Sequence, residues 1–152
     1  MGFDLYSLGN HKSSNGEYFR NNVWWWRPLW NYCLINYPTL ANKVKYANSN
    51  DGDGLNSRDS KNLAFLIKKD IENGKAQKYA NERQIYLDSL PLQKCEHCNG
   101  TGVRNDRYVQ GECNGCHGAG KVKQWQTYYP FSIENLSEFQ EFLDNCGGFS
   151  IC

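Results

Sequence analysis

The apolar residues of this chain recur at helical spacing in two segments. After Ser57 or Asp59, either of which can cap a helix, they follow an i, i+3, i+4 pattern up to Gly74. This first stripe consists of Leu63, Leu66, Ile67 and Ile71. Near the end of the chain, Ser132 is placed to cap a second helix of this kind. Its core face consists of Leu136, Phe139, Phe142 and Leu143.

A further helix is expected directly after Gly74, from Lys75 to about Ser89. It carries Tyr79, Ala80, Tyr86 and Leu87 on one side. Because the joint at Gly74 is short, we expect the helices on either side of it to form an antiparallel pair. Pro91 ends the second of them.

Two short segments at the ends of the sequence predict extended structure. Residues Phe3 to Leu8 alternate between apolar and polar side chains, as a strand does. The final residues, Phe149 to Cys152, are short and apolar, so we expect them to dock on the body of the protein. The expected helices, together with these extended segments, indicate the α+β class and a small, mainly helical domain. At 152 residues the chain has the length of a single domain, 1–152.

The stretch from Tyr18 to Tyr37 is unusually aromatic. Pro28 suits the first turn of a helix, and it biases Arg27 away from helical angles. We therefore expect an extended arm up to Arg27 and a helix from Pro28 to about Asn36. The buried stripe of this helix is predicted to be Leu29, Trp30, Cys33 and Tyr37.

Three consecutive tryptophans, Trp24, Trp25 and Trp26, cannot all share one face of a strand or a helix. They are either buried on both faces of a thin region or partly exposed. Exposed tryptophans beside Arg20 and Arg27 would suit a partner-binding surface, because Trp and Arg dominate interface hot spots. The predicted partner-binding residues are Trp24, Trp25, Trp26, Arg27 and Arg20.

The polar segment from Asn48 to Asp59 superficially resembles a calcium-binding loop. With Gly54 as the turn glycine, Ser49 and Ser60 occupy the first and last ligand positions, where the calcium-binding pattern needs carboxylates. We therefore expect a turn that leads into the following helix.

Two repeats of the form C-x-x-C-x-G-x-G dominate the chemistry of the chain. They place Cys95 and Cys98 in one pair and Cys113 and Cys116 in another. The matched C-x-x-C pairs are a strong zinc signal, although the fourteen residues between Cys98 and Cys113 fall just short of the usual window. Four thiolates fill a tetrahedral shell without leaving a position for water. We therefore predict one structural zinc ion in a hairpin lobe at residues 94–123. The alternatives are four ordinary cysteines, two disulfides, or a ligand set in which His97 or His117 replaces a cysteine.

Residues 95–122 resemble the cysteine-rich zinc region of DnaJ-type chaperones. That region has four such repeats and two zinc ions, whereas this chain has two repeats, which implies one ion. The resemblance implies a zinc-bound β-hairpin lobe. It does not imply a co-chaperone, because the His-Pro-Asp tripeptide of J-domains is absent from this sequence.

Charge and cysteine content narrow the setting in which the protein is expected to act. The net charge is +1, so the whole chain gives no electrostatic case for binding nucleic acid or a membrane surface. No apolar run is long enough to span a bilayer, and the first residues lack a signal-peptide pattern. Seven cysteines, four of them with metal-ligand spacing, suit a reducing compartment. We therefore expect a cytoplasmic protein with no membrane partner.

The chain as a whole resembles a group of phage, prophage and bacterial proteins that share the motif GEYFRNNVWWWRPLW, which begins here at Gly16. The resemblance also covers Met1 to Tyr6, the two cysteine repeats, and Asn145 to Cys152. It implies a phage-type origin. We therefore expect a non-enzymatic, zinc-stabilised protein that binds a host protein complex, including a counter-defence role.

Two other functions stay open on the sequence. The first is nucleic-acid binding, with basic residues around the cysteine repeats contacting phosphates and tryptophans stacking on bases. Those basic residues are Arg104, Arg107, Lys121 and Lys123. The second is an enzyme with an unrecognised site, since no hydrolase, zinc-protease, phosphate-loop or dinucleotide motif occurs.

Overall fold

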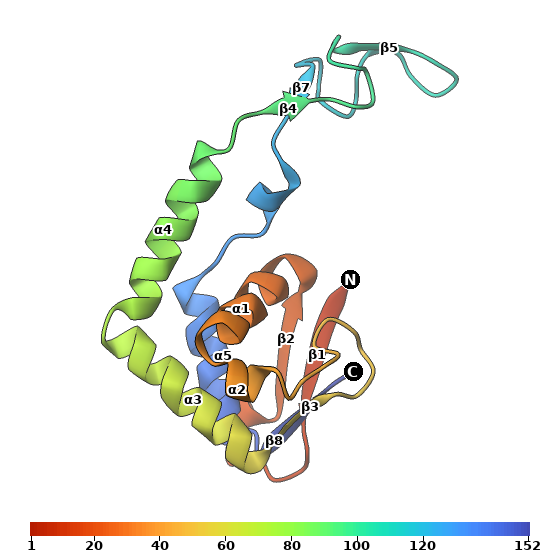
Figure 1. The fold of residues 1–152 in the computed structure, drawn as a ribbon. Helices are drawn as coiled ribbons and strands as arrows, with labels where there is room; N and C mark the ends of the chain where they lie inside the picture. The colour runs from red at the N-terminus through yellow and green to blue at the C-terminus, as the bar shows by residue number, and fades with distance from the viewer. The chain divides into compact units, whose positions relative to one another are not determined.

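A four-stranded antiparallel sheet joins the two ends of the sequence. The computed structural model describes all residues, 1–152, and its strand order is β2 (Tyr18–Asn22), β1 (Gly2–Ser7), β8 (Gly148–Ile151) and β3 (Gly54–Asn56) (Figure 1). In the central pair, Leu5 lies opposite Ile151. The expected strand near Phe3 is therefore confirmed, and the C-terminal segment docks as an inner strand.

Five helices complete the α+β fold, and the predicted class is confirmed. They are α1 (Val23–Asn36), α2 (Pro38–Ala41), α3 (Ser57–Glu72), α4 (Lys75–Ser89) and α5 (Ile133–Asn145), and Ser14–Gly16 forms a short 3-10 turn, η1. No helix is both long and apolar enough to cross a bilayer.

The chain divides into two compact units. The main unit contains Met1–Gln84 and Tyr129–Cys152, and the cysteine unit contains Ile85–Tyr128. The lobe expected at 94–123 falls inside the cysteine unit. Its chain forms two small antiparallel pairs, β4 (Gln93–Lys94) with β7 (Lys121–Val122) and β5 (Val103–Asn105) with β6 (Gln110–Glu112), followed by a 3-10 turn, η2 (Trp125–Tyr128).

Aromatic side chains fill the core of the main unit. Phe139 of α5 contacts Phe19 of β2 and Phe149 of β8, which fixes this helix against one face of the sheet. The indole rings of Trp26 and Trp30 stack with their centroids 5.3 Å apart. The indole N–H of Trp26 donates a hydrogen bond to the Ala47 carbonyl oxygen at 2.7 Å. Burial of such large rings is the main stabilising contribution in this unit.

The predicted apolar stripes of α1, α3 and α5 all face the core. Leu29, Trp30 and Cys33 are buried on α1, and the α5 stripe is entirely buried. On α3, Leu63 and Ile67 are buried, and the other two stripe residues are partly buried against the same core.

The predicted start of α1 is wrong. The helix begins at Val23, so Pro28 lies inside it rather than in its first turn. The side chain of Asn22 accepts a hydrogen bond from the N–H of Trp25 at 3.1 Å, and this N-cap starts the helix where β2 ends. The local cap therefore outweighs the helix-breaking tendency of the proline.

Two further expectations need correction. The N-cap of α3 is Asn56, which accepts from the N–H of Asp59 at 2.8 Å, rather than Ser57 or Asp59. Helices α3 and α4 do not form an antiparallel pair, because α3 packs along α5 instead. Within the main unit, Ala76 is the one fully buried residue of α4, so this helix has little apolar surface to offer α3.

We predict that Asn22→Ala lowers the free energy of unfolding by about 1 kcal/mol, because the first turn of α1 loses its side-chain acceptor. Asn22→Asp should retain most of the stability. Chemical denaturation of both variants tests this. Asn62→Ala, an exposed change within α3, serves as the control and should not destabilise. Equal stability of Asn22→Ala and wild type would contradict the role of the cap.

Candidate metal centre

The two cysteine repeats fold into knuckles with the same hydrogen bonds. In the first knuckle, the N–H of Gly100 donates to the Cys95 carbonyl oxygen at 3.1 Å, and the N–H of Gly102 donates to the Cys98 Sγ at 3.2 Å. In the second knuckle, the N–H of Gly118 bonds to the Cys113 carbonyl oxygen at 3.2 Å, and the N–H of Gly120 bonds to the Cys116 Sγ at 3.2 Å. Each knuckle thus holds its second sulfur with a backbone donor.

The knuckles also bond to each other reciprocally. The N–H of Cys95 donates to the carbonyl oxygen of Gly120, and the N–H of Cys113 donates to that of Gly102, both at 2.9 Å. The first cysteine of each repeat is therefore tied to the last glycine of the other, which relates the repeats by an approximate two-fold symmetry.

Glycine is required at two of these positions. Gly102 has a φ of +78°, and a Cβ built there would lie 2.3 Å from the carbonyl oxygen of Gly118. Gly120 is its counterpart, with a φ of +72° and a clash at 2.4 Å with the carbonyl oxygen of Gly100. A side chain would be strained by the positive φ and would also push the knuckles apart.

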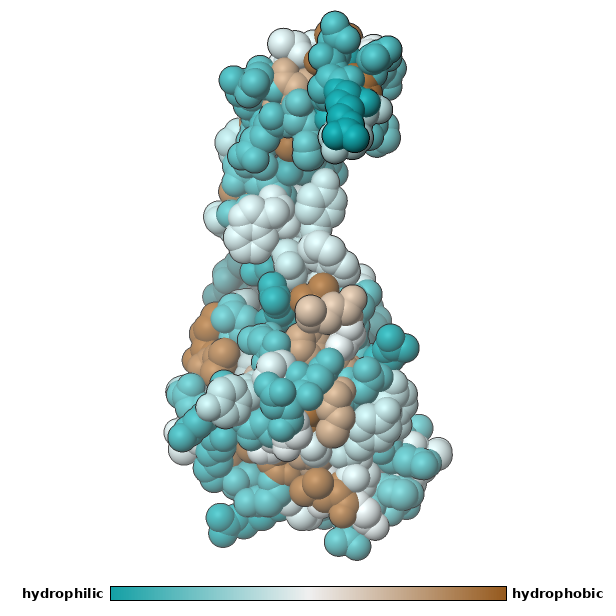
Figure 2. All heavy atoms as spheres, turned by 90° about the vertical axis from the view of Figure 1, so that its right-hand side faces the viewer, coloured by the Kyte–Doolittle hydropathy of each residue, from teal (hydrophilic) through white to brown (hydrophobic).

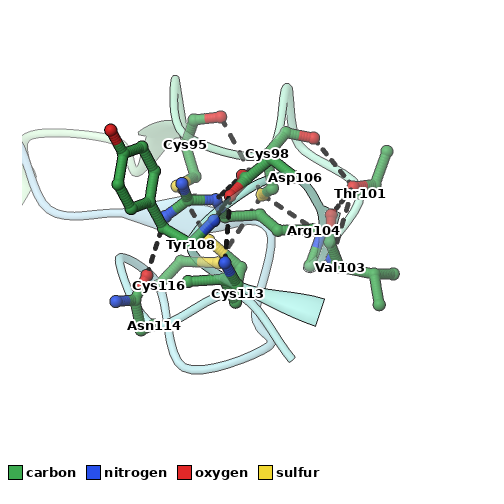
Figure 3. A network of polar contacts seen from close by, with 12 residues as sticks. Cys95, Cys98, Thr101, Val103, Arg104, Asp106, Tyr108, Cys113, Asn114 and Cys116 are labelled. Atoms are coloured by element: carbon green, nitrogen blue, oxygen red, sulfur yellow. Dashed lines mark hydrogen bonds and ion pairs between the residues drawn. The ribbon is translucent and has the colours of Figure 1, made fainter. Parts of the chain in front are cut away.

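This backbone brings four sulfur atoms together. Figure 3 shows Cys95, Cys98, Cys113 and Cys116 gathered in one place. Their Sγ atoms all lie within 4.8 Å of one another, and the side chains are buried. The Cys95–Cys113 and Cys98–Cys116 sulfur separations are 3.9 and 3.7 Å. These are nearly twice the 2.05 Å of a disulfide, so the four cysteines are free thiols arranged as a metal site could be.

Two thiols of the cluster, those of Cys98 and Cys116, have pKa values shifted in opposite directions. Burial opposes ionisation of Cys98, but the N–H of Gly102 and the neighbouring thiols outweigh it and lower the pKa of Cys98 to about 6. Burial, helped by the neighbouring thiols, raises the pKa of Cys116 to about 11. Close thiols resist full deprotonation together, and a bound cation would favour the four-thiolate form.

Neither histidine of the repeats joins the cluster. His97 and His117 are exposed, and the group of potential ligands consists of the four cysteines. His117 has a φ of +50° and occupies the same knuckle position as Asn99, with a φ of +52°. The four cysteines predicted as ligands come together in one cluster, so the spacing of the two repeats was the clearest structural signal in the sequence.

The hairpin tip beside the cluster is held by a polar network. Arg104 donates from Nε to Asp106 Oδ2 at 2.6 Å and from Nη1 to Asn114 Oδ1 at 2.9 Å (Figure 3). Asp106 in turn accepts from the backbone N–H groups of Tyr108 and Val109. The Tyr108 N–H, followed by the Arg104 guanidinium, lowers the pKa of Asp106, so this carboxylate stays charged and fixes the turn.

An apolar core is missing from the segment around the cluster. Among residues 91–124, the buried positions are the four cysteines together with Gly102 and Gly120. Figure 2 shows a mostly hydrophilic surface over this segment, at the top of the view. So small a unit without apolar burial needs another source of stability, which a metal ion bound by the cysteines can supply.

The predicted partner-binding residues divide between surface and core. Trp24 and Trp25 are 45% and 38% exposed, and Arg20 and Arg27 are also exposed. Trp26 is fully buried, so its assignment to a partner-binding surface is wrong. Successive residues of a helix point about 100° apart, so once α1 begins at Val23 only one of the three tryptophans faces the core.

Two features around the exposed tryptophans were not predicted. The ring of Trp24 packs on Tyr129 with centroids 4.8 Å apart, and Nη1 of Arg27 lies 3.5 Å from the Tyr129 hydroxyl. Trp25 lines a groove of about 390 Å³, to which α4 and the residues before α5 also contribute. The residues that line this groove come from three distant parts of the sequence. The one sequence signal that could have indicated the groove is the helical spacing of amide side chains on α4.

Comparisons with protein-family models, with curated proteins and with solved structures found no match to this chain.

We predict that Gly102→Ala weakens metal binding by at least about tenfold, because the added methyl group meets the Gly118 carbonyl oxygen. Gly111→Ala is the matched control, since Gly111 also has a positive φ, of +121°, but has open space around its Cβ position. Competition with a chromogenic chelator measures both affinities. Equal loss in the two variants would show that φ strain alone, and not the contact between knuckles, controls the site.

Proposed function

We propose that this chain is a non-enzymatic, zinc-stabilised binding protein. It is of phage type and acts in the cytoplasm on a host protein complex, with counter-defence as the role we favour. The observation that carries the proposal is the exposure of Trp24 and Trp25 on the first turn of α1, in a unit whose core holds other tryptophans completely.

Zinc is the ion that best suits the cysteine cluster. A regular tetrahedron with zinc–sulfur bonds of about 2.3 Å has sulfur–sulfur edges of about 3.8 Å. The Cys98–Cys116 and Cys95–Cys113 separations, 3.7 and 3.9 Å, lie on either side of this value. Four thiolates would complete the shell of one ion, so we assign the zinc a structural role in holding the cysteine unit.

The partner surface is proposed around Trp24, Trp25 and Arg27, with Arg20 as a further contributor. Trp24 and Arg27 are three residues apart on α1 and meet the same tyrosine, Tyr129, so they form one continuous surface. A large aromatic ring left in water gains free energy when a partner covers it, and Trp and Arg contribute strongly at interface centres.

Nucleic-acid binding through the cysteine unit has weaker support. Arg104 is already bonded to Asp106 and Asn114. Between residues 85 and 128 the sequence has five Lys and Arg residues against four Asp and Glu residues. A zinc ion with four thiolates adds two negative charges, so the zinc-bound unit carries net negative charge and would repel phosphates.

We predict one zinc ion per chain in the purified protein. Cys98→Ser should lose the ion, because one of four thiolates is replaced by a poor zinc ligand. Cys152→Ser is the control, since Cys152 is exposed and outside the cluster, and it should keep full zinc content. Elemental analysis gives the stoichiometry. Zinc retained by Cys98→Ser, or zinc lost from Cys152→Ser, would contradict the assignment.

We predict that a host protein captured by the wild type is lost, by at least about tenfold, from Trp25→Ala. Phe65→Ala removes another exposed aromatic ring, on α3, and should retain the partner. Pull-down from host lysate with quantitative mass spectrometry measures the three proteins side by side, after circular dichroism has shown that each is folded. Equal capture by Trp25→Ala would reject this surface, and recovery of nucleic acid alone would favour the alternative function.

A further inference from the structure

The groove beside Trp25 has both apolar and amide walls. Trp25 of α1 lies on one side of it, and Phe131 and Ile133 contribute apolar surface from the chain that enters α5. On the α4 side, the Gln77 amide donates to Asn81 Oδ1 at 2.9 Å. This bond uses one donor and one acceptor, and it leaves the Gln77 carbonyl oxygen and the Asn81 amide nitrogen available to a peptide main chain.

One end of the groove leads onto an acidic stripe of α5. Glu134 lines the groove, and Glu138 and Glu141 follow it at i+4 and i+7, on the same face of the helix. All three carboxylates are exposed, opposite the buried stripe of this helix. No ion pair in the structure includes any of them. The sequence from Glu134 to Cys152 contains no Lys or Arg, so this negative charge is not compensated along the chain.

We propose that the groove and the stripe together bind a short basic segment of a protein partner. An apolar side chain of the segment enters the groove beside Trp25, and its Lys or Arg side chains lie against Glu134, Glu138 and Glu141. The inference rests on the proposed protein-binding function and specifies the chemistry of the partner. Charge complementarity carries it, because three carboxylates that share one helix face and form no ion pair attract cations and repel the phosphates of nucleic acids.

A library of random short peptides displayed on yeast tests the proposal. The full-length, metal-loaded protein is the bait, and peptides that also bind Trp25→Ala are removed by counter-selection. We expect the remaining peptides to combine an apolar residue with several Lys or Arg residues. Their affinity should weaken as the salt concentration rises, because exposed charges are screened by salt.

Charge variants then locate the binding. Glu138→Lys with Glu141→Lys should weaken the selected peptides by about tenfold or more, and Glu138→Gln with Glu141→Gln should weaken them less. Glu72→Lys, a reversal at an exposed position of α3, is the matched control and should bind like wild type. Circular dichroism establishes that each variant is folded.

Three outcomes overturn the proposal: no peptide is enriched, the enriched peptides are not basic, or they bind the Glu138 and Glu141 variants as they bind the wild type. A host protein that is still captured by the charge-reversed variant, but lost from Trp25→Ala, would overturn the acidic docking site and leave the proposed binding function intact.

Discussion

The repulsion that arises when four closely spaced thiols ionise is the constraint on which the cysteine unit depends. Hydrogen bonds between Cys95 and Gly120, and between Cys113 and Gly102, bring the sulfurs together, and so concentrate negative charge wherever the thiols ionise. Almost nothing else around them is buried, so apolar packing cannot offset that repulsion. The main unit is stabilised differently, by aromatic rings packed between helices and sheet. The two units therefore draw their stability from different sources.

Sequence analysis succeeded where structure depends on short-range spacing. The cysteine repeats, the stripes of α3 and α5, and the bounds of α4 all follow from residues close together in the chain. It failed where two local signals compete, as between the cap at Asn22 and the proline at Pro28. It also failed where the answer depends on distant partners: the burial of Trp26 depends on Ala47 and Phe139. The groove beside Trp25 is likewise assembled from three separate segments.

The buried and exposed tryptophans of α1 act together. Trp26 is held by its stacking on Trp30 and by its hydrogen bond to Ala47, so the first turn of the helix has little freedom to move. Its neighbours Trp24 and Trp25 project from that fixed turn. A partner that contacts them would lose less conformational entropy on binding than one that contacts tryptophans on a mobile loop. The core position of Trp26 thus contributes indirectly to the surface we propose.

The pairing of β1 with β8 also has a kinetic consequence. Contacts such as Leu5 with Ile151 join residues at opposite ends of the sequence, and contacts of this range slow folding because a long loop must close first. The cysteine unit lies within that loop, and its strand pairs join residues that are much closer in sequence than Leu5 and Ile151. Pairing of Gln93 with Val122 brings the two ends of this segment together, so its early folding shortens the loop that remains to be closed. A metal ion bound far from the main sheet in sequence would in this way accelerate the formation of that sheet.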